Sequence, residues 1–217
     1  MKIAIIGASG FVGKALISEA LHRNYEVLSI SRSNLKTPQD DHPKLTAKSI
    51  NIYDVENLAK ALEGYDVVIS AFNAGWSNPN LYNDNMQGFQ DIESAVKLAE
   101  VERFIMIGGA GTLSVEGQQL VDATGFPREI EPGASSCRDY FNILKKENYL
   151  NWTYFSPAPG MNPGVTQGRT GKYRLGTQNP VFDEKGRSIL SVEDAAVAVI
   201  DEVENKQFIK RQFTAAY

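Results

Sequence analysis

Three glycines near the start of the chain have the spacing of a loop that holds a phosphate group. After a short apolar run the chain reads Gly7-Ala8-Ser9-Gly10-Phe11-Val12-Gly13, and a stretch with helical periodicity follows. Gly7 permits a tight turn, Gly10 lets the backbone approach a phosphate, and Gly13 allows close packing of a helix on a strand. The spacing is GxxGxxG rather than GxGxxG. Its position between a strand and a helix N-terminus nevertheless favours a dinucleotide site over a purely structural turn.

The elements that must position this loop alternate along the whole chain. Short apolar, β-branched runs are typical of strands buried on both faces of a parallel sheet, and segments of helical periodicity separate them. Asp54 and Ser191 are predicted to cap two of the helices. The pattern predicts an α/β fold with a doubly wound parallel sheet, in one domain over residues 1–217. Strands are predicted at Lys2–Ile6, Glu26–Ile30, Val67–Ser70, Phe104–Ile107, Trp152–Phe155 and Gln212–Thr214, and helices at Val12–Leu21, Val55–Leu62, Phe89–Ala99, Cys137–Leu144 and Val192–Val203.

One stretch breaks the alternation. Residues 157–190 are rich in glycine and proline and contain two Asn-Pro dipeptides, Asn162-Pro163 and Asn179-Pro180. Such composition is typical of loops. We predict that this segment covers a substrate.

Several stretches of the sequence together resemble a known group. They are MKIAIIGASGFVGKAL, DVVISAFNAGW, RFIMIGGAGTL, FSPA and SVEDAAVAVIDEVE. The chain resembles the extended and atypical short-chain dehydrogenase/reductase superfamily. More narrowly, it resembles small bacterial proteins described as NADH-flavin reductases or NAD-dependent epimerase/dehydratase-like proteins, relatives of the NmrA-like and biliverdin reductase B groups. The resemblance implies a Rossmann-type sheet, a bound nicotinamide dinucleotide and a small substrate pocket under the C-terminal third.

The end of the second strand bears on which dinucleotide is bound. An acidic residue there would bind the ribose 2′-hydroxyl of NAD, whereas an arginine would bind the 2′-phosphate of NADP. The chain has Ser31 and Arg32 at this point, with Lys36 close by in the sequence. We therefore predict NADP, with NAD possible. The resemblance places the adenine near Asp54, which is also a predicted helix cap.

Residues at the ends of the next strands are implied to lie along the rest of the cofactor. The resemblance places the loop Ala71-Phe72-Asn73 beside the nicotinamide ribose and the diphosphate, and it places Ser156 and Pro157 at the nicotinamide face. Gly108 and Gly109 end the predicted strand Phe104–Ile107, at the edge where open α/β sheets bind ligands. Trp76 is predicted either to form a wall of the pocket or to pack in the core.

The usual acid/base pair of the superfamily is missing. Most members use a YxxxK pair, in which the ammonium lowers the pKa of the tyrosine. None of the nine tyrosines here is followed by lysine four residues later. Tyr140 remains a candidate proton donor, although its helical spacing with Cys137 and Phe141 is equally typical of a core position. Cys137 has no histidine partner in the pattern and is expected to be an inert buried thiol.

These features lead to three hypotheses. The first is an NAD(P)H-dependent oxidoreductase that passes hydride to a small conjugated acceptor, either a flavin or a quinone-like molecule, with the proton taken from solvent. The second is an NmrA-like redox sensor that binds the dinucleotide without turnover. The third, a sugar-nucleotide epimerase or dehydratase, lacks its usual acid/base residues.

The composition of the chain limits the kinds of partner that we expect it to bind. The chain has 217 residues, a formal net charge of −4 and one cysteine. Basic and acidic residues are interspersed, so we expect no binding to nucleic acid or to membranes. With two histidines and a lone cysteine we expect no metal site and no disulfide. The sequence predicts a cytoplasmic protein that acts on a small molecule as a monomer or homodimer.

Overall fold

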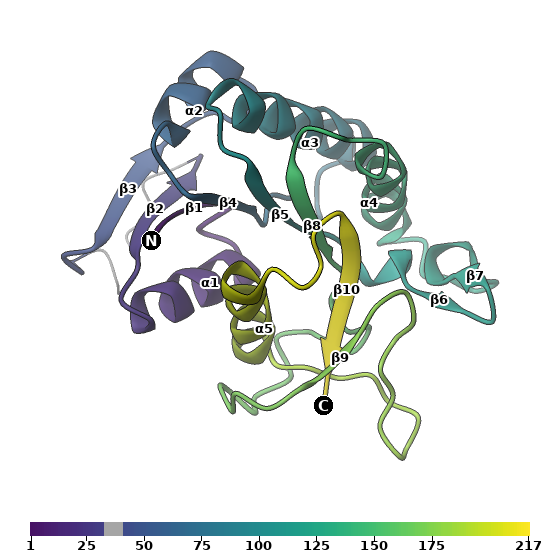
Figure 1. Cartoon of the computed structure of the whole chain (residues 1–217). Coiled ribbons are helices and arrows are strands. Elements are labelled where there is room, and N and C mark those ends of the chain that lie inside the picture. The colour runs from purple at the N-terminus through teal and green to yellow at the C-terminus, as the bar shows by residue number, and fades with distance from the viewer. Residues whose placement is uncertain (33–40) are drawn as a thin grey trace.

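The computed structural model describes residues 1–32 and 41–217. These residues form one large sheet of eight strands with helices on both faces (Figure 1). The strand order is β3-β2-β1-β4-β5-β8-β10-β9. Neighbouring strands pair in parallel except β9, which is antiparallel to β10. The bounds are β1 Lys2–Ile6, β2 Glu26–Ser31, β3 Leu45–Ser49, β4 Val67–Ser70, β5 Arg103–Ile107, β8 Asn151–Phe155, β9 Arg174–Gly176 and β10 Arg211–Ala216.

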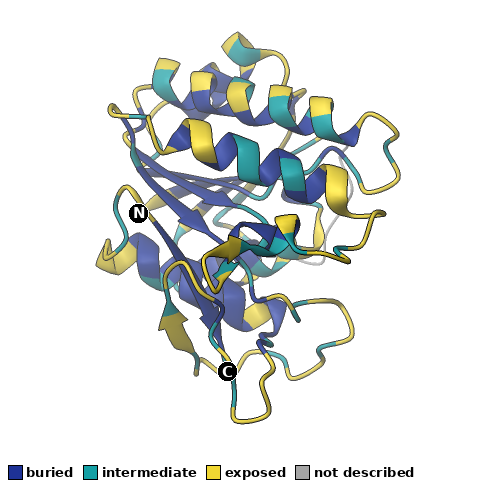
Figure 2. Ribbon diagram, turned by 90° about the vertical axis from the view of Figure 1, so that its right-hand side faces the viewer, coloured by how far each residue is buried: buried dark blue, intermediate teal, exposed yellow. Residues whose placement is uncertain are grey.

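In the described part of the chain, two helices cover one face of the sheet and three cover the other. α1 (Phe11–His22) and α5 (Val192–Asn205) pack on one side, and α2 (Val55–Leu62), α3 (Leu81–Leu98) and α4 (Glu131–Leu144) pack on the opposite side. Successive residues of β1 alternate between the two resulting cores, and burial on both faces explains why the strands read as unbroken apolar runs. Figure 2 shows the buried strands between the helix layers and the exposed residues on the outer helix faces and the loops.

Both predicted helix caps are confirmed. The Asp54 carboxylate accepts a hydrogen bond from the Asn57 N–H (3.2 Å) at the start of α2. The Ser191 hydroxyl accepts one from the Asp194 N–H (3.1 Å) at the start of α5. Each bond satisfies a backbone donor that the first turn of a helix leaves without a partner.

The elements that the sequence did not predict are short or lie at an edge. β3 is largely exposed, so its residues carry no apolar run. A small hairpin of β6 (Ser114–Val115) and β7 (Gln118–Gln119) follows β5, between the 3₁₀ helices η1 (Ala110–Thr112) and η2 (Leu120–Asp122). The strands and helices were predicted from apolar runs and helical periodicity, and these short pieces have neither.

The predicted fold class is confirmed, and the sheet fixes where a ligand can bind. The strand order runs outward in both directions from β1 and β4, so the chain changes direction between these two strands. In open α/β sheets the crevice beyond the carboxyl ends of such a strand pair is the ligand site. Among the described residues, no helix is both long and apolar enough to cross a bilayer.

Candidate functional site: the carboxyl edge of the sheet

Gly7 and Gly13 are required by the packing of the protein itself. Gly7 has a positive φ of 78°, and a Cβ atom there would lie 2.4 Å from the Ala71 carbonyl oxygen. A Cβ atom at Gly13 would lie 2.2 Å from the Gly7 carbonyl oxygen. These two glycines therefore bring β1, β4 and the start of α1 within contact of one another.

Gly10 differs from its two neighbours in the motif. Its φ of −76° suits any residue, and the nearest atom to an added Cβ would be the Gly7 carbonyl oxygen at 3.2 Å. It is exposed at the N-cap of α1, where no side chain caps the helix and no acidic residue lies in the first turn. An exposed helix N-terminus without a capping side chain fits a pyrophosphate.

The glycine loop is bonded to β2, and its remaining residues differ in how far they are buried. The N–H groups of Gly7 and Ala8 both donate to the Ile30 carbonyl (3.0 and 3.1 Å), which ties the loop to the end of β2. Ala8 is buried, Ser9 and Val12 are half-buried, and Phe11 is exposed. Among the loop's own side chains, Phe11 is therefore the large one that is exposed.

The end of β2 provides positive charge at the predicted ribose position. Arg32 is exposed directly after β2, and its carbonyl accepts a hydrogen bond from the Ser49 hydroxyl (2.9 Å). Burial raises the pKa of the Tyr53 phenol, and the nearby Arg32 charge partly opposes that shift. Tyr53 was not among the predicted site residues; it is exposed, and its hydroxyl donates to the Asp84 carbonyl (3.2 Å). Ser31 is half-buried, Asp54 is exposed beyond its capping bond, and Lys36 lies outside the described residues.

The loop after β4 presents its backbone rather than its side chains. Phe72 is buried, and its ring lies edge-on to Tyr53 (6.4 Å) and Phe89 (6.0 Å), so this side chain belongs to the core. The Ala71 N–H donates to the Ile6 carbonyl (2.8 Å), which continues the pairing of β4 with β1. Asn73 is half-buried and its amide oxygen accepts from the Gly75 N–H (2.8 Å). The predicted role of this loop beside the cofactor thus rests on Ala71, Asn73 and the main chain.

Buried polar side chains join the ends of β5, β8 and β10. The Gln212 amide donates to the Ser156 hydroxyl (2.8 Å), and Ser156 and Thr112 share a hydrogen bond of 2.7 Å. The Thr112 hydroxyl donates to the Gly109 carbonyl (2.8 Å), which leaves Ser156 as the donor in the shared bond. The Ser156 side chain therefore faces the protein interior. Pro157, which follows it, is half-buried.

The two glycines at the end of β5 differ in what they contact. A Cβ atom at Gly108 would lie 2.0 Å from the Tyr154 ring, so the core requires glycine there. A Cβ atom at Gly109 would lie 3.5 Å from the Cys137 Cβ, an ordinary contact. Core packing therefore requires glycine at position 108, independently of any ligand, but not at position 109.

Tyr140 lies in the core rather than in a pocket. Its side chain is fully buried between α3 and α4, and its hydroxyl donates to the Glu93 carboxylate at 2.7 Å. Burial raises the pKa of this phenol well above its ordinary value, and the Glu93 charge adds to the shift. This position argues against Tyr140 as proton donor. Burial likewise raises the pKa of Cys137 to about 12, which fits an unreactive thiol.

The segment 157–190 contributes β9 to the sheet, where it pairs with β10, and it is also attached to α1, α5 and the loop after β5. Arg169 donates to the Glu19 carboxylate on α1 (2.6 Å), and the N–H groups of Thr170 and Gly171 donate to the Asp194 carboxylate on α5 (2.8 and 2.7 Å). Further along, the Gln178 carbonyl accepts from the Ser114 N–H beyond β5 (2.8 Å). The segment thus connects the α1/α5 face with the loops after β5, while its role as a substrate cover stays a prediction.

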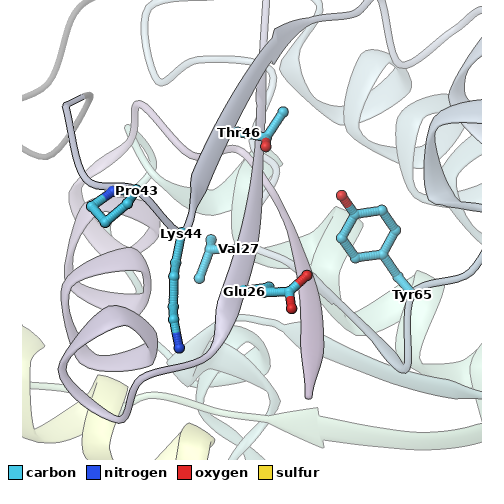
Figure 3. A pocket seen from close by; sticks show the side chains of 6 residues that line it. All are labelled: Glu26, Val27, Pro43, Lys44, Thr46 and Tyr65. Atoms are coloured by element: carbon cyan, nitrogen blue, oxygen red, sulfur yellow. The ribbon is translucent and has the colours of Figure 1, made fainter.

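A small open pocket lies at the opposite edge of the sheet. It has a volume of about 240 Å³ and lies at the amino ends of β2 and β3 (Figure 3). The ammonium of Lys44 is held by the carbonyl and side-chain oxygens of Asn24 (3.0 and 2.6 Å). Burial and the charge of Glu26 raise the pKa of the Tyr65 phenol. The pocket is remote from the glycine loop and contains none of the predicted site residues; its lining residues are Glu26, Val27, Pro43, Lys44, Thr46 and Tyr65.

The sheet, the glycine loop and its helix N-terminus define a nicotinamide dinucleotide-binding protein of the Rossmann type. Residues 7–206 match the model of the NAD(P)H-binding family. The chain belongs to this family, and the predicted resemblance to the atypical short-chain dehydrogenase/reductase superfamily is confirmed.

Similar proteins span nearly the whole chain. An uncharacterised protein of Bacillus subtilis, YwnB, is 33% identical over 99% of this chain and 97% of its own length. A candidate epimerase of Bacteroides thetaiotaomicron is 40% identical, with a TM-score of 0.90 over 100% of this chain and 96% of that one. A candidate NADH-flavin reductase of Streptococcus pneumoniae is 32% identical, with a TM-score of 0.86 over 100% of this chain and 99% of that one.

Proposed function

We propose that this protein is an NADPH-dependent reductase that transfers hydride to a small planar acceptor of the flavin or quinone class. The observation that carries the proposal is the contrast within the glycine loop. Packing explains Gly7 and Gly13, whereas Gly10 is exposed at an uncapped helix N-terminus and has a φ that any residue adopts. A dinucleotide pyrophosphate fits that terminus and its partial positive charge.

The preference for NADPH rests on Arg32. Its guanidinium is exposed after β2, at the point where an NAD-specific fold would carry a carboxylate. A guanidinium can bind a phosphate through two hydrogen bonds, which favours the 2′-phosphate.

Transfer to a planar acceptor needs little from the protein beyond binding and orientation. When bound, the reduced nicotinamide supplies a hydride, and one proton from solvent completes the two-electron reduction of the acceptor. The main chain after β1 and β4 would hold the diphosphate, and the ends of β5 and β8 would border the nicotinamide. The core position of Tyr140 and the absence of a YxxxK pair favour this chemistry over epimerase chemistry, the activity suggested by the name of the Bacteroides protein.

Turnover distinguishes the reductase from a redox sensor. Purified protein is mixed with NADPH and a panel of FMN, riboflavin and naphthoquinones, and the loss of NADPH absorbance is followed. Continuous consumption that depends on both protein and acceptor supports the reductase. Calorimetry that shows tight NADPH binding, together with no consumption across the panel, would replace the proposal with the sensor.

A further inference from the structure

Trp76 is the most exposed large apolar side chain among the described residues, with 62% of its surface accessible. The sequence allowed either a pocket wall or a core position, and the structure excludes the core. An indole exposed to water lacks the large stabilising free energy that its burial would contribute. Exposed aromatic surface on a folded protein often marks a binding site. This side chain has no assigned role in the proposed function.

The backbone that bears Trp76 is held firmly. Trp76 occupies a tight turn in which the Asn78 N–H donates to the Gly75 carbonyl (2.9 Å). The Asn78 amide in turn donates to Asp84 in the first turn of α3 (2.7 Å). The exposed indole thus belongs to a turn that these hydrogen bonds hold in place.

A chain of buried hydrogen bonds braces the same loop from behind. The Ala74 N–H donates to the fully buried Asn85 amide oxygen (2.8 Å), and the Asn85 amide donates to the Ser136 hydroxyl on α4 (3.0 Å). Ser136 donates to the Gly133 carbonyl (2.8 Å). Together these polar groups fix the loop after β4 against the start of α4.

Gly133 also supports the indole ring. A Cβ atom at Gly133 would lie 2.7 Å from the Trp76 Cζ3 atom, so one edge of the ring rests on this stretch of backbone. The next residue, Ala134, would lie 3.2 Å from a Cβ atom at Gly111, in the loop after β5. The start of α4, on which the indole edge rests, thus packs against the loop after β5, while Trp76 itself belongs to the loop after β4. These are the two loops expected to border the nicotinamide.

We propose that Trp76 is the stacking surface for the planar acceptor and that Asn85, Ser136 and Gly133 position it. This inference rests on the proposed function and adds to it the residue that contacts the acceptor. A rigid, exposed aromatic ring binds a flat conjugated molecule by stacking, with little loss of conformational entropy.

The test measures acceptor binding separately from turnover. FMN is titrated with wild-type, Trp76→Ala and Trp76→Phe proteins in the presence of NADP⁺, and flavin emission is followed because contact with an indole quenches it. We expect strong quenching with wild-type protein and affinity lower by about tenfold for Trp76→Ala, a typical contribution of one stacked ring. Trp76→Phe should recover part of the affinity, and kcat/KM for FMN should follow the same order while KM for NADPH is unchanged.

A matched control removes an exposed aromatic ring elsewhere. Tyr149 is also largely exposed, and it precedes β8 at the opposite edge of the sheet. Tyr149→Ala should bind FMN as the wild-type protein does. Equal FMN affinity in wild-type and Trp76→Ala proteins, or no FMN binding by the wild-type protein, would overturn the stacking proposal. If binding depends on Trp76 but NADPH is not consumed, the reductase proposal fails and the stacking site stands.

Discussion

At the amino edge of the sheet, the Arg103 guanidinium donates to the Glu202 carboxylate at 2.8 Å, with both side chains buried. The same carboxylate accepts from the N–H groups of Gln207 and Phe208 (2.9 and 3.0 Å). At the carboxyl edge, the glycine loop exposes Gly10 and an uncapped helix N-terminus. One edge pairs its buried charges with each other, although the Arg103 Nε has no hydrogen-bond partner, and the other edge leaves backbone donors for a ligand. Changes at the two edges should therefore affect different properties.

The largest effect is expected at the amino edge. Glu202→Ala would leave the buried Arg103 charge without its partner, and breaking a buried ion pair in this way costs about 3–5 kcal/mol of stability. Urea denaturation should show this loss, and NADPH affinity should change little at a temperature where the variant is folded. Glu193→Ala removes an exposed carboxylate from the same helix and serves as the control. A variant of wild-type stability would show that the ion pair contributes nothing.

The next effect belongs to the glycine loop. Gly10→Val should lower NADPH affinity by about a hundredfold or more while the fold is kept, because the side chain would fill the space for the pyrophosphate and weaken charge-assisted hydrogen bonds. Gly13→Val should instead prevent proper folding, since its Cβ would lie 2.2 Å from the Gly7 carbonyl oxygen. Calorimetry and circular dichroism on both variants test the contrast. Unchanged NADPH affinity in folded Gly10→Val protein would remove the basis of the proposed function.

A smaller effect is expected at Arg32. Arg32→Ala should weaken NADPH binding by about tenfold at low salt and leave NADH binding unchanged. The reason is that the free energy contributed by an exposed charge-assisted hydrogen bond lies at the lower end of the range for such bonds. The difference should shrink as salt is added. Lys60→Ala removes an exposed positive charge from α2 and should have no such effect. Wild-type protein that binds NADH and NADPH equally well would argue for NAD.

The smallest effect on activity is expected at Tyr140. Tyr140→Phe should keep its turnover, whereas loss of a positioned general acid lowers rates by about 10²- to 10⁴-fold. Its stability should fall by about 1–3 kcal/mol, because the Glu93 carboxylate loses a buried donor. Steady-state kinetics and urea denaturation on one preparation separate these outcomes. A rate loss of several hundredfold at unchanged NADPH affinity would return Tyr140 to the chemistry.

The sequence predicted best where one physical requirement governs a whole segment. Burial on both faces gives β1 and β5 unbroken apolar runs, and capping chemistry places Asp54 and Ser191 at helix starts. Position in the sequence could not tell which way a side chain points. The Phe72 ring and the Ser156 hydroxyl both belong to residues at strand ends, and both turn into the protein.

The interactions that join distant parts of the chain were the hardest to predict. The contact of Gln212 with Thr112 spans 100 residues, and no local pattern in the sequence marks either partner. The same is true of Trp76, because its exposure depends on Gly133 and on the hydrogen bonds of Asn85. Tertiary packing decided these positions.

The bond between Glu19 and Arg169 joins residues 150 positions apart, whereas β1, β2 and the glycine loop are neighbours in sequence. Contacts of long sequence separation form late, because closing a long loop costs entropy before any contact rewards it. The glycine loop with β1 and β2 can therefore form from the first part of the chain to be synthesised. The 157–190 segment docks onto α1 only after the last third of the chain has been synthesised. We expect refolding followed by hydrogen exchange to protect the amides of β1 and β2 before those of Thr170 and Gly171.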